Sequence, residues 1–308
     1  MNHRYDRRTF CQAIGAAAAL AAIAPVRGEA DPAGMLTRPI PSTGERLPVI
    51  GLGTSGVFDV GTDPGERAPL REVLDILIGS GGSLLDTSPM YGRAEEVAGG
   101  LIAAEQLRSR MFLATKVWTR GREAGLEQIE TSMKLLRSPK LDLVQVHNLV
   151  DLDTQLATLR GLKEQGRVRY IGVTHYTVAS HDELERVLKK VQLDFVQFNY
   201  SIGTREAEER LLPLAAERKV AVLVNRPFED GALFNRVRGQ ALPAWAAEID
   251  CESWAQFFLK FIVGHPSVTC VIPATSKPRH MRDNAAAGHG RMPDGEMRER
   301  MANYLASL

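Results

Sequence analysis

The feature that most constrains the fold is a regular alternation of short apolar runs with longer segments of helical periodicity. Most of the short runs lack alternation of apolar and polar residues, as is typical of strands buried on both faces. The runs of strand length are Val49–Leu52, Leu84–Asp86, Met111–Lys116, Leu141–His147, Tyr170–Thr174, Phe195–Phe198, Val220–Val224 and Val268–Ile272. The segments of helical period between them are Pro69–Ile78, Glu123–Arg137, Thr154–Glu164, His181–Lys190 and Glu206–Arg218. Strand, helix, strand in this order predicts a parallel sheet.

The number of strand–helix units favours a closed (β/α)8 TIM barrel, whose usual length is about 250 residues. An open, doubly wound sheet is the alternative that the repeat leaves open. No long linker rich in Pro, Gly or Ser divides the region, so we predict a single barrel domain over residues 31–308. Residues 38–47 resemble a hairpin that turns at Thr43 and Gly44, and we expect it to plug the N-terminal mouth of the barrel.

Composition and charge exclude several classes of function. The 308 residues carry a formal net charge of +1, which provides no overall field to hold a nucleic acid. Cysteine and histidine spacings suggest no metal site. Cys251 and Cys270 are candidates for a disulfide in an oxidising compartment, but Cys270 lies in an apolar run. We therefore expect Cys270 to be buried as a small hydrophobic residue.

The first thirty residues have the organisation of an export signal. Arg7 and Arg8, with Phe10 close behind, precede a run of small and apolar residues from Cys11 to Ala24. This pattern resembles the twin-arginine signals that direct folded proteins across the bacterial inner membrane. We predict a twin-arginine signal peptide over residues 1–30, the export machinery as a partner, a periplasmic location and no stable membrane span after cleavage. A cytoplasmic N-terminal helix and an uncleaved anchor are the alternatives.

The sequence from Gly51 to Gly56 matches the pattern G-x-G-x-x-G of dinucleotide-binding loops. Such a loop must open directly into a helix whose N-terminus meets the pyrophosphate. Here residues 57–65 contain two glycines, a proline and two aspartates, which do not form one. We therefore interpret the match as coincidental.

Titratable side chains stand at or just after the ends of three consecutive predicted strands. Asp86 ends the second strand, Tyr91 follows in the next loop, Lys116 ends the third strand and His147 ends the fourth. A charge that ends an apolar strand needs a partner, because an isolated buried charge is very costly. Adjacent barrel strands would bring these side chains together at the face where barrel enzymes hold their active sites.

These residues resemble the Asp/Tyr/Lys/His tetrad of the aldo-keto reductase superfamily. The resemblance covers essentially all of residues 38–290 and includes further motifs after the first, fifth, sixth and eighth strands. It implies that Tyr91 protonates the substrate carbonyl while hydride arrives from a nicotinamide, and that the cation of Lys116 makes Tyr91 a better proton donor. It also implies that Asp86 pairs with Lys116 and that His147 orients or polarises the substrate oxygen.

The resemblance further implies a cofactor site for NADP, with NAD as the alternative. The residues that it assigns to this site are Gly53, Thr54, Asp86, Thr174, His175, Gln197, Asn225, Arg226, Thr275, Ser276, Lys277, Arg279, His280 and Asn284. Three of them depart from the family pattern. His175 replaces an asparagine, Asn225 stands where an aromatic ring commonly stacks on nicotinamide, and His280 takes the place of an arginine, with Lys277 and Arg279 nearby.

Two functions are compatible with these residues. The first is an exported oxidoreductase that transfers hydride between NADP and an aldehyde or ketone, and the intact tetrad favours it. The alternative is a non-catalytic module on the same barrel that binds the dinucleotide and serves as a regulatory or partner-binding protein. The altered nicotinamide site favours that alternative. Val57, Phe58, Met90 and Trp118 flank the predicted site, and we expect them to line an apolar substrate pocket.

Overall fold

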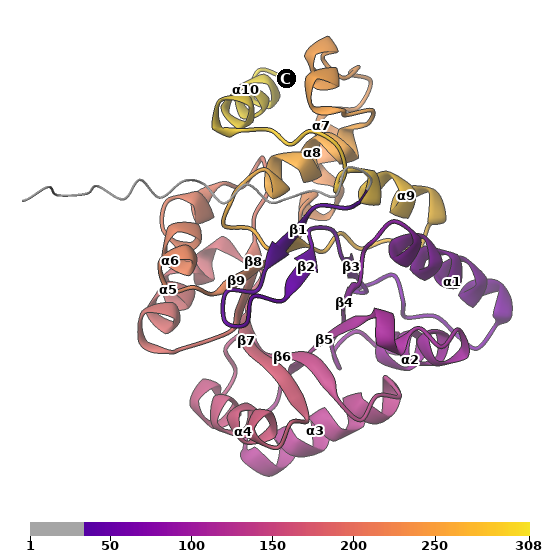
Figure 1. Cartoon of the computed structure of the whole chain (residues 1–308), viewed down its shortest axis with the longest axis vertical. Helices are drawn as coiled ribbons and strands as arrows, with labels where there is room; N and C mark the ends of the chain where they lie inside the picture. The colour runs from indigo at the N-terminus through magenta and orange to yellow at the C-terminus, as the bar shows by residue number, and fades with distance from the viewer. Residues whose placement is uncertain (1–33) are drawn as a thin grey trace, which may run out of the picture.

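The computed structural model describes residues 34–308, in which eight parallel strands form one sheet in the order of the sequence (Figure 1). The strands are β3 (Leu52–Gly53), β4 (Leu84–Asp86), β5 (Phe112–Val117), β6 (Leu141–His147), β7 (Val168–Thr174), β8 (Phe195–Asn199), β9 (Ala221–Asn225) and β10 (Cys270–Val271). Parallel bridges join Ile50 to Val271 and Gly53 to Ala274, and they close the sheet. The predicted barrel is therefore confirmed, and the doubly wound alternative is wrong. The signal predicted over residues 1–30 lies outside the described residues.

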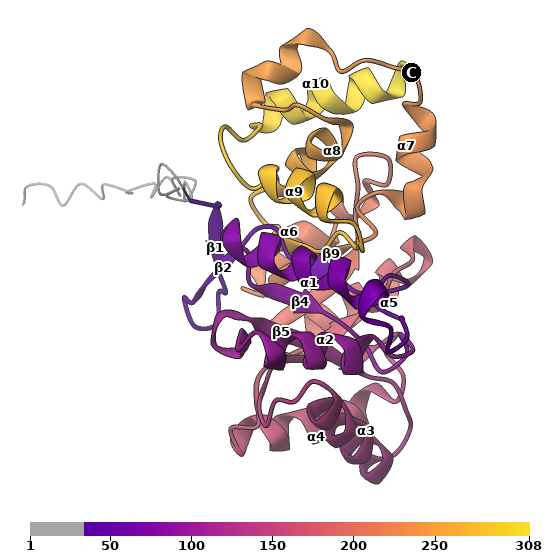
Figure 2. The same cartoon turned by 90° about the vertical axis from the view of Figure 1, so that its right-hand side faces the viewer.

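Helices follow the strands and surround the barrel (Figure 1). Those of the barrel wall are α1 (Pro64–Gly79), α2 (Ala94–Ala104), α3 (Arg122–Leu135), α4 (Leu152–Glu164), α5 (His181–Lys190), α6 (Leu211–Glu217), α8 (Trp254–Val263), which packs on β10, and α9 (Pro278–Ala286). Two more, α7 (Ala232–Arg236) and α10 (Gly295–Ala306), lie beyond α8 at one end of the molecule, as both Figure 1 and Figure 2 show. Short 3-10 helices cover Arg108–Arg110, Val178–Ser180, Glu206–Glu208, Glu229–Gly231 and Ala244–Ile249. In the part of the chain from residue 34 onward, none of the helices has the length and apolar character that a membrane span needs.

A hairpin of β1 (Thr37–Pro39) and β2 (Arg46–Pro48) fills the N-terminal end of the barrel. Its residues Ile40 and Leu47 are buried in one apolar cluster with interior side chains from the beginnings of the strands, such as Phe112 and Phe195. The hairpin turns at Gly44, whose φ of 79° lies in the left-handed region that favours glycine. This confirms the predicted plug. The C-terminal ends of the strands are therefore the open face, on which a site can form.

Gly53 lies on the line along which the barrel closes. A Cβ atom at Gly53 would lie 2.9 Å from the carbonyl oxygen of Ile272, so the close approach of the first and last strands excludes a side chain there. The segment after Gly53 continues into turns before α1 begins at Pro64. Gly53 therefore serves barrel closure, and the segment is not the strand-to-helix turn of an open dinucleotide-binding sheet.

Both cysteines of the described chain, Cys251 and Cys270, are free and buried. Cys270 belongs to the cluster of apolar side chains inside the barrel. The expectation of a small buried hydrophobic residue is confirmed, and the disulfide alternative is wrong.

Candidate active site

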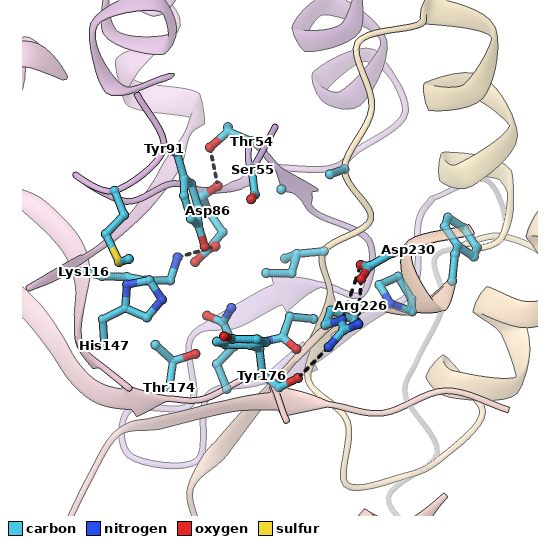
Figure 3. Close-up of a pocket in the computed structure, with 18 of the residues that line it drawn as sticks. Thr54, Ser55, Asp86, Tyr91, Lys116, His147, Thr174, Tyr176, Arg226 and Asp230 are labelled. Atoms are coloured by element: carbon cyan, nitrogen blue, oxygen red, sulfur yellow. Dashed lines mark hydrogen bonds and ion pairs between the residues drawn. The ribbon is translucent and has the colours of Figure 1, made fainter. Parts of the chain in front are cut away.

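Residue alternation along the strands brings the four predicted catalytic residues into the top of the barrel. On β5, Phe112 and Ala114 belong to the interior cluster, so Lys116, two positions further on, also points inward. The same alternation directs Asp86 of β4 and His147 of β6 into the interior. The loop after β4 carries Tyr91 back over them, and Figure 3 shows the four side chains facing one another on one side of the cavity.

Lys116 and Asp86 form a buried ion pair. The ammonium Nζ lies 2.6 Å from Oδ2 of Asp86 and also donates to the backbone oxygen of Thr87 at 2.7 Å. The two side chains belong to residues that are only 1% and 2% exposed. Burial favours the neutral amine, but the charge of Asp86 and the nearby Tyr91 outweigh it and raise the pKa of Lys116. Lys116 is therefore a fixed cation at neutral pH.

Tyr91 and His147 are arranged around this cation. Nζ of Lys116 lies 4.9 Å from the centroid of the Tyr91 ring. The rings of Tyr91 and His147 meet edge to face, with their centroids 6.3 Å apart. Burial, together with the cation of Lys116 and with His175, lowers the pKa of His147 to about 3. His147 is therefore a neutral imidazole, which donates one hydrogen bond and accepts one.

A cavity of about 690 Å³ opens beside these residues at the C-terminal ends of the strands. Its lining includes most of the predicted residues from the first seven barrel strands and their loops: Gly53, Thr54, Asp86, Tyr91, Lys116, His147, Thr174, Gln197, Asn225 and Arg226. The remaining predicted cofactor residues lie outside this lining: His175, Thr275, Ser276, Lys277, Arg279, His280 and Asn284.

His175 points away from the cavity. Its Nδ1 accepts from the backbone N–H of Tyr176 at 2.9 Å, its Nε2 lies 3.0 Å from the hydroxyl of Ser180, and its ring stacks on that of Tyr176. Asn225, from β9, donates its amide to the backbone oxygen of His175 at 3.0 Å and lines the cavity itself. The family pattern has an asparagine at position 175, where this chain has a histidine. Asn225 provides an amide side chain close to that position, from β9, which pairs with β8.

The segment between β10 and α9 presents a different kind of surface. The hydroxyl of Thr275 accepts from the backbone N–H of Lys277 at 3.0 Å and fixes the turn into the helix. Lys277, Arg279 and His280 are exposed at the N-terminus of α9, whereas Asn284 is buried. A helix N-terminus with free backbone N–H groups and cationic side chains is a favourable place for a phosphate.

Sequence reasoning missed several residues of the cavity wall, namely Ser55, Asn148, Tyr176, Asp230 and Phe234. Asn148 and Tyr176 directly follow predicted residues, so their position just past a strand end was the available signal. Asp230 gave none, because a loop with left-handed residues brings it back to Arg226, with which it pairs at 2.6 Å (Figure 3). Met90 lines the cavity as expected, but the other three residues expected there do not: Val57 packs against the core, Phe58 is fully buried in it and Trp118 is exposed.

The cavity wall carries buried polar atoms that have no protein partner among residues 34–308. They are Oδ1 of Asp86, Oδ1 of Asn148 and Oδ1 of Asn225, and Oε1 of Gln145 lies behind the wall in the same state. Gln145 reaches the site through its amide, which donates to the side-chain oxygen of Gln197 at 2.7 Å. Buried acceptors of this kind are costly unless a ligand donates to them. The wall therefore fits a ligand with an amide group, as a nicotinamide has.

Comparison with known proteins agrees with this geometry. Residues 49–302 match the model of the aldo/keto reductase family, so the chain belongs to this family. Among curated proteins it is 30% identical to the methylglyoxal reductase YeaE of Escherichia coli over 247 residues, which cover 78% of this chain and 85% of that protein. Among solved structures, an aldo-keto reductase from Klebsiella pneumoniae in complex with NADPH is 26% identical, with a TM-score of 0.71 and coverage of 85% of this chain and 92% of that one. The fold and the site thus define an aldo-keto reductase.

Proposed function

We propose that the chain reduces small aldehydes or ketones with NADPH, and that it does so outside the cytoplasm. The observation that carries the proposal is the meeting of Asp86, Tyr91, Lys116 and His147 at one wall of a cavity of about 690 Å³. A buried ion pair beside a tyrosine in a cavity favours catalysis over binding alone, because perturbed ionisable groups of this kind cluster at reaction sites.

Each of these side chains has a task in the proposed reaction. A bound nicotinamide supplies the hydride. Tyr91 donates the proton to the carbonyl oxygen, and the positive charge of Lys116 stabilises the tyrosinate that remains. Asp86 holds that charge in place through the 2.6 Å contact, and the neutral His147 donates a hydrogen bond to the substrate oxygen. Asn225, Gln197 and Thr174 would hold the nicotinamide amide, and the N-terminus of α9 would hold the adenosine phosphate.

We infer methylglyoxal and related 2-oxoaldehydes as the first substrates to test. The relative in Escherichia coli is named for methylglyoxal reduction and matches this chain over most of its length. The cavity wall that contains Tyr91 also contains the thioether of Met90 and the polar side chain of Asn148. A short substrate with one apolar end and a second oxygen suits such a wall.

The test is carbonyl-dependent oxidation of NADPH by the purified protein, with Tyr91→Phe as the diagnostic variant. We expect Tyr91→Phe to bind NADPH as tightly as the wild type and to lose at least about a hundredfold in kcat/KM, because the phenyl ring cannot donate a proton. Lys116→Met should lose activity similarly. Cofactor binding without turnover on any of a panel of aldehydes and ketones would favour the non-catalytic alternative.

The proposal of export rests on residues 1–30 alone. Replacement of both Arg7 and Arg8 by lysine preserves charge, so only a receptor that distinguishes guanidinium from ammonium would respond. We expect this variant to stay in the cytoplasm at precursor length, whereas the unchanged protein is recovered from the periplasm at a shorter length. Equal export of the two proteins would rule out the twin-arginine route.

A further inference from the structure

Ser88 contacts both His147 and Tyr91, but it has no role in the reaction proposed above. It is fully buried in the loop that follows β4. Its hydroxyl oxygen lies 3.3 Å from Nδ1 of His147 and accepts a hydrogen bond from the backbone N–H of Met90, also at 3.3 Å. Its backbone oxygen accepts from the N–H of Tyr91 at 3.0 Å. One residue thus contacts the imidazole and fixes the turn that carries the tyrosine.

The available hydrogens of Ser88, Met90 and His147 decide which residue donates in the hydrogen bond between Ser88 and His147. The hydroxyl oxygen of Ser88 is already an acceptor for Met90, while its own hydrogen needs an acceptor. If Nδ1 of His147 carried the ring proton, the hydroxyl would accept twice and its hydrogen would be buried without a partner, which is costly. If Nδ1 is unprotonated, the hydroxyl donates to it, so that both the hydroxyl hydrogen of Ser88 and the N–H of Met90 have acceptors.

We propose that Ser88 is a positioning residue that keeps His147 in the tautomer with its proton on Nε2, the ring nitrogen free to donate to a substrate oxygen. The low pKa of His147 supports the argument, because a neutral ring has a single N–H whose place can be chosen. In the other tautomer Nε2 would present a lone pair to the carbonyl oxygen and repel it. The proposal rests on the reductase function, but its first test does not.

That first test is nitrogen NMR of the full-length protein labelled at its seven histidines, because the two neutral tautomers give different ring-nitrogen shifts. The variant His147→Asn assigns the signals. We expect wild-type His147 to carry its proton on Nε2, and Ser88→Ala to contain a substantial fraction of the other tautomer. A proton on Nδ1 in the wild type, or an unchanged spectrum of His147 in Ser88→Ala, would overturn the proposal even if the enzyme is active.

Two variants provide the controls. Ser88→Thr retains the hydroxyl and should restore the wild-type tautomer. Ser180→Ala removes a serine–histidine contact of the same kind at His175, and it should change the signals of His175 while those of His147 stay the same.

Kinetics give the second measurement. With a confirmed carbonyl substrate, Ser88→Ala should lower kcat about tenfold, the effect of one weakened hydrogen bond in the transition state, while the dissociation constant for NADPH stays unchanged. Ser88→Thr should recover most of the rate. A loss of NADPH binding in Ser88→Ala together with an unchanged tautomer would instead indicate a structural role for the Tyr91 turn.

Discussion

At the scale of single residues, the site owes its properties to which charges are paired and which groups stay neutral. Lys116 is charged because Asp86 lies within 2.6 Å, and His147 is neutral because burial and that same cation disfavour a second positive charge. The sequence allowed the residue types and their approximate meeting place to be predicted, since all but Tyr91 end a strand. It did not allow the contact between Ser88 and His147 to be predicted, because that contact depends on the distance between the loop after β4 and the end of β6.

The neutral histidines imply a loss of stability in acid. Burial lowers the pKa of His147 to about 3 and that of His265 to about 4, from an ordinary value of 6.5. Because the folded pKa is the lower one, the unfolded chain takes up protons first as the pH falls, and the stabilisation present above pH 6.5 is lost towards pH 4. We expect the free energy of unfolding in urea to fall over this range and the slope to be shallower in His265→Gln. Stability that does not change with pH in this range would contradict the assignment.

Asn225 provides the second prediction at this scale. Its Oδ1 is buried without a partner among the described residues, and its amide is anchored on the backbone of His175. We expect Asn225→Leu to weaken NADPH binding about tenfold, the effect of losing one hydrogen bond to a buried group. Binding of 2′,5′-ADP, which lacks the nicotinamide, should be unchanged by calorimetry. An equal loss for both ligands would mean that the substitution disturbs the fold of the pocket instead.

At the scale of elements, strands were easier to predict than helices. The apolar runs located all eight barrel strands, and the helical period located α1, α3, α4, α5 and α6. By contrast, α8 is buried along nearly its whole surface and so shows no polar face from which a period can be read. The Ala- and Gly-rich α2 was also missed, because its backbone packs directly on α3 at Gly99. Helices of this kind form because of their tertiary packing, which a periodic pattern in the sequence does not show.

The N-terminus of α9 carries the prediction about cofactor choice. Lys277 and Arg279 are exposed there, and the first turn contains no acidic residue. We expect the double variant Lys277→Met/Arg279→Met to bind NADPH at least about tenfold more weakly and NADH nearly as before, because only the former carries a 2′-phosphate. Arg282→Met is the matched control, since Arg282 lies on the same helix but pairs with Glu72 at 2.6 Å. An equal weakening of NADH and NADPH binding would mean that the 2′-phosphate binds elsewhere.

At the scale of the whole molecule, Arg38 connects the N-terminal hairpin to the end of α8 and to the segment that leads from it into β10. Its guanidinium donates to the backbone oxygens of Val263, His265 and Val268. We expect Arg38→Met to lower the free energy of unfolding by about 2–4 kcal/mol, because these carbonyls lose a charged donor. Arg46→Met in the same hairpin removes only exposed contacts and should cost less than about 1 kcal/mol. Similar effects of the two substitutions in urea unfolding would show that the connection contributes little.

Barrel closure has a consequence for biosynthesis. The bridges from Ile50 to Val271 and from Gly53 to Ala274 join segments from opposite ends of the chain, so a nascent polypeptide must wait for its last strand to leave the ribosome. Until then the edge of β3 has unpaired backbone groups, and the interior face of the unfinished sheet offers apolar surface to any neighbouring chain. We therefore expect a stalled or truncated product to be bound by chaperones and degraded by proteases, and the ligand site to form only once β10 has been synthesised.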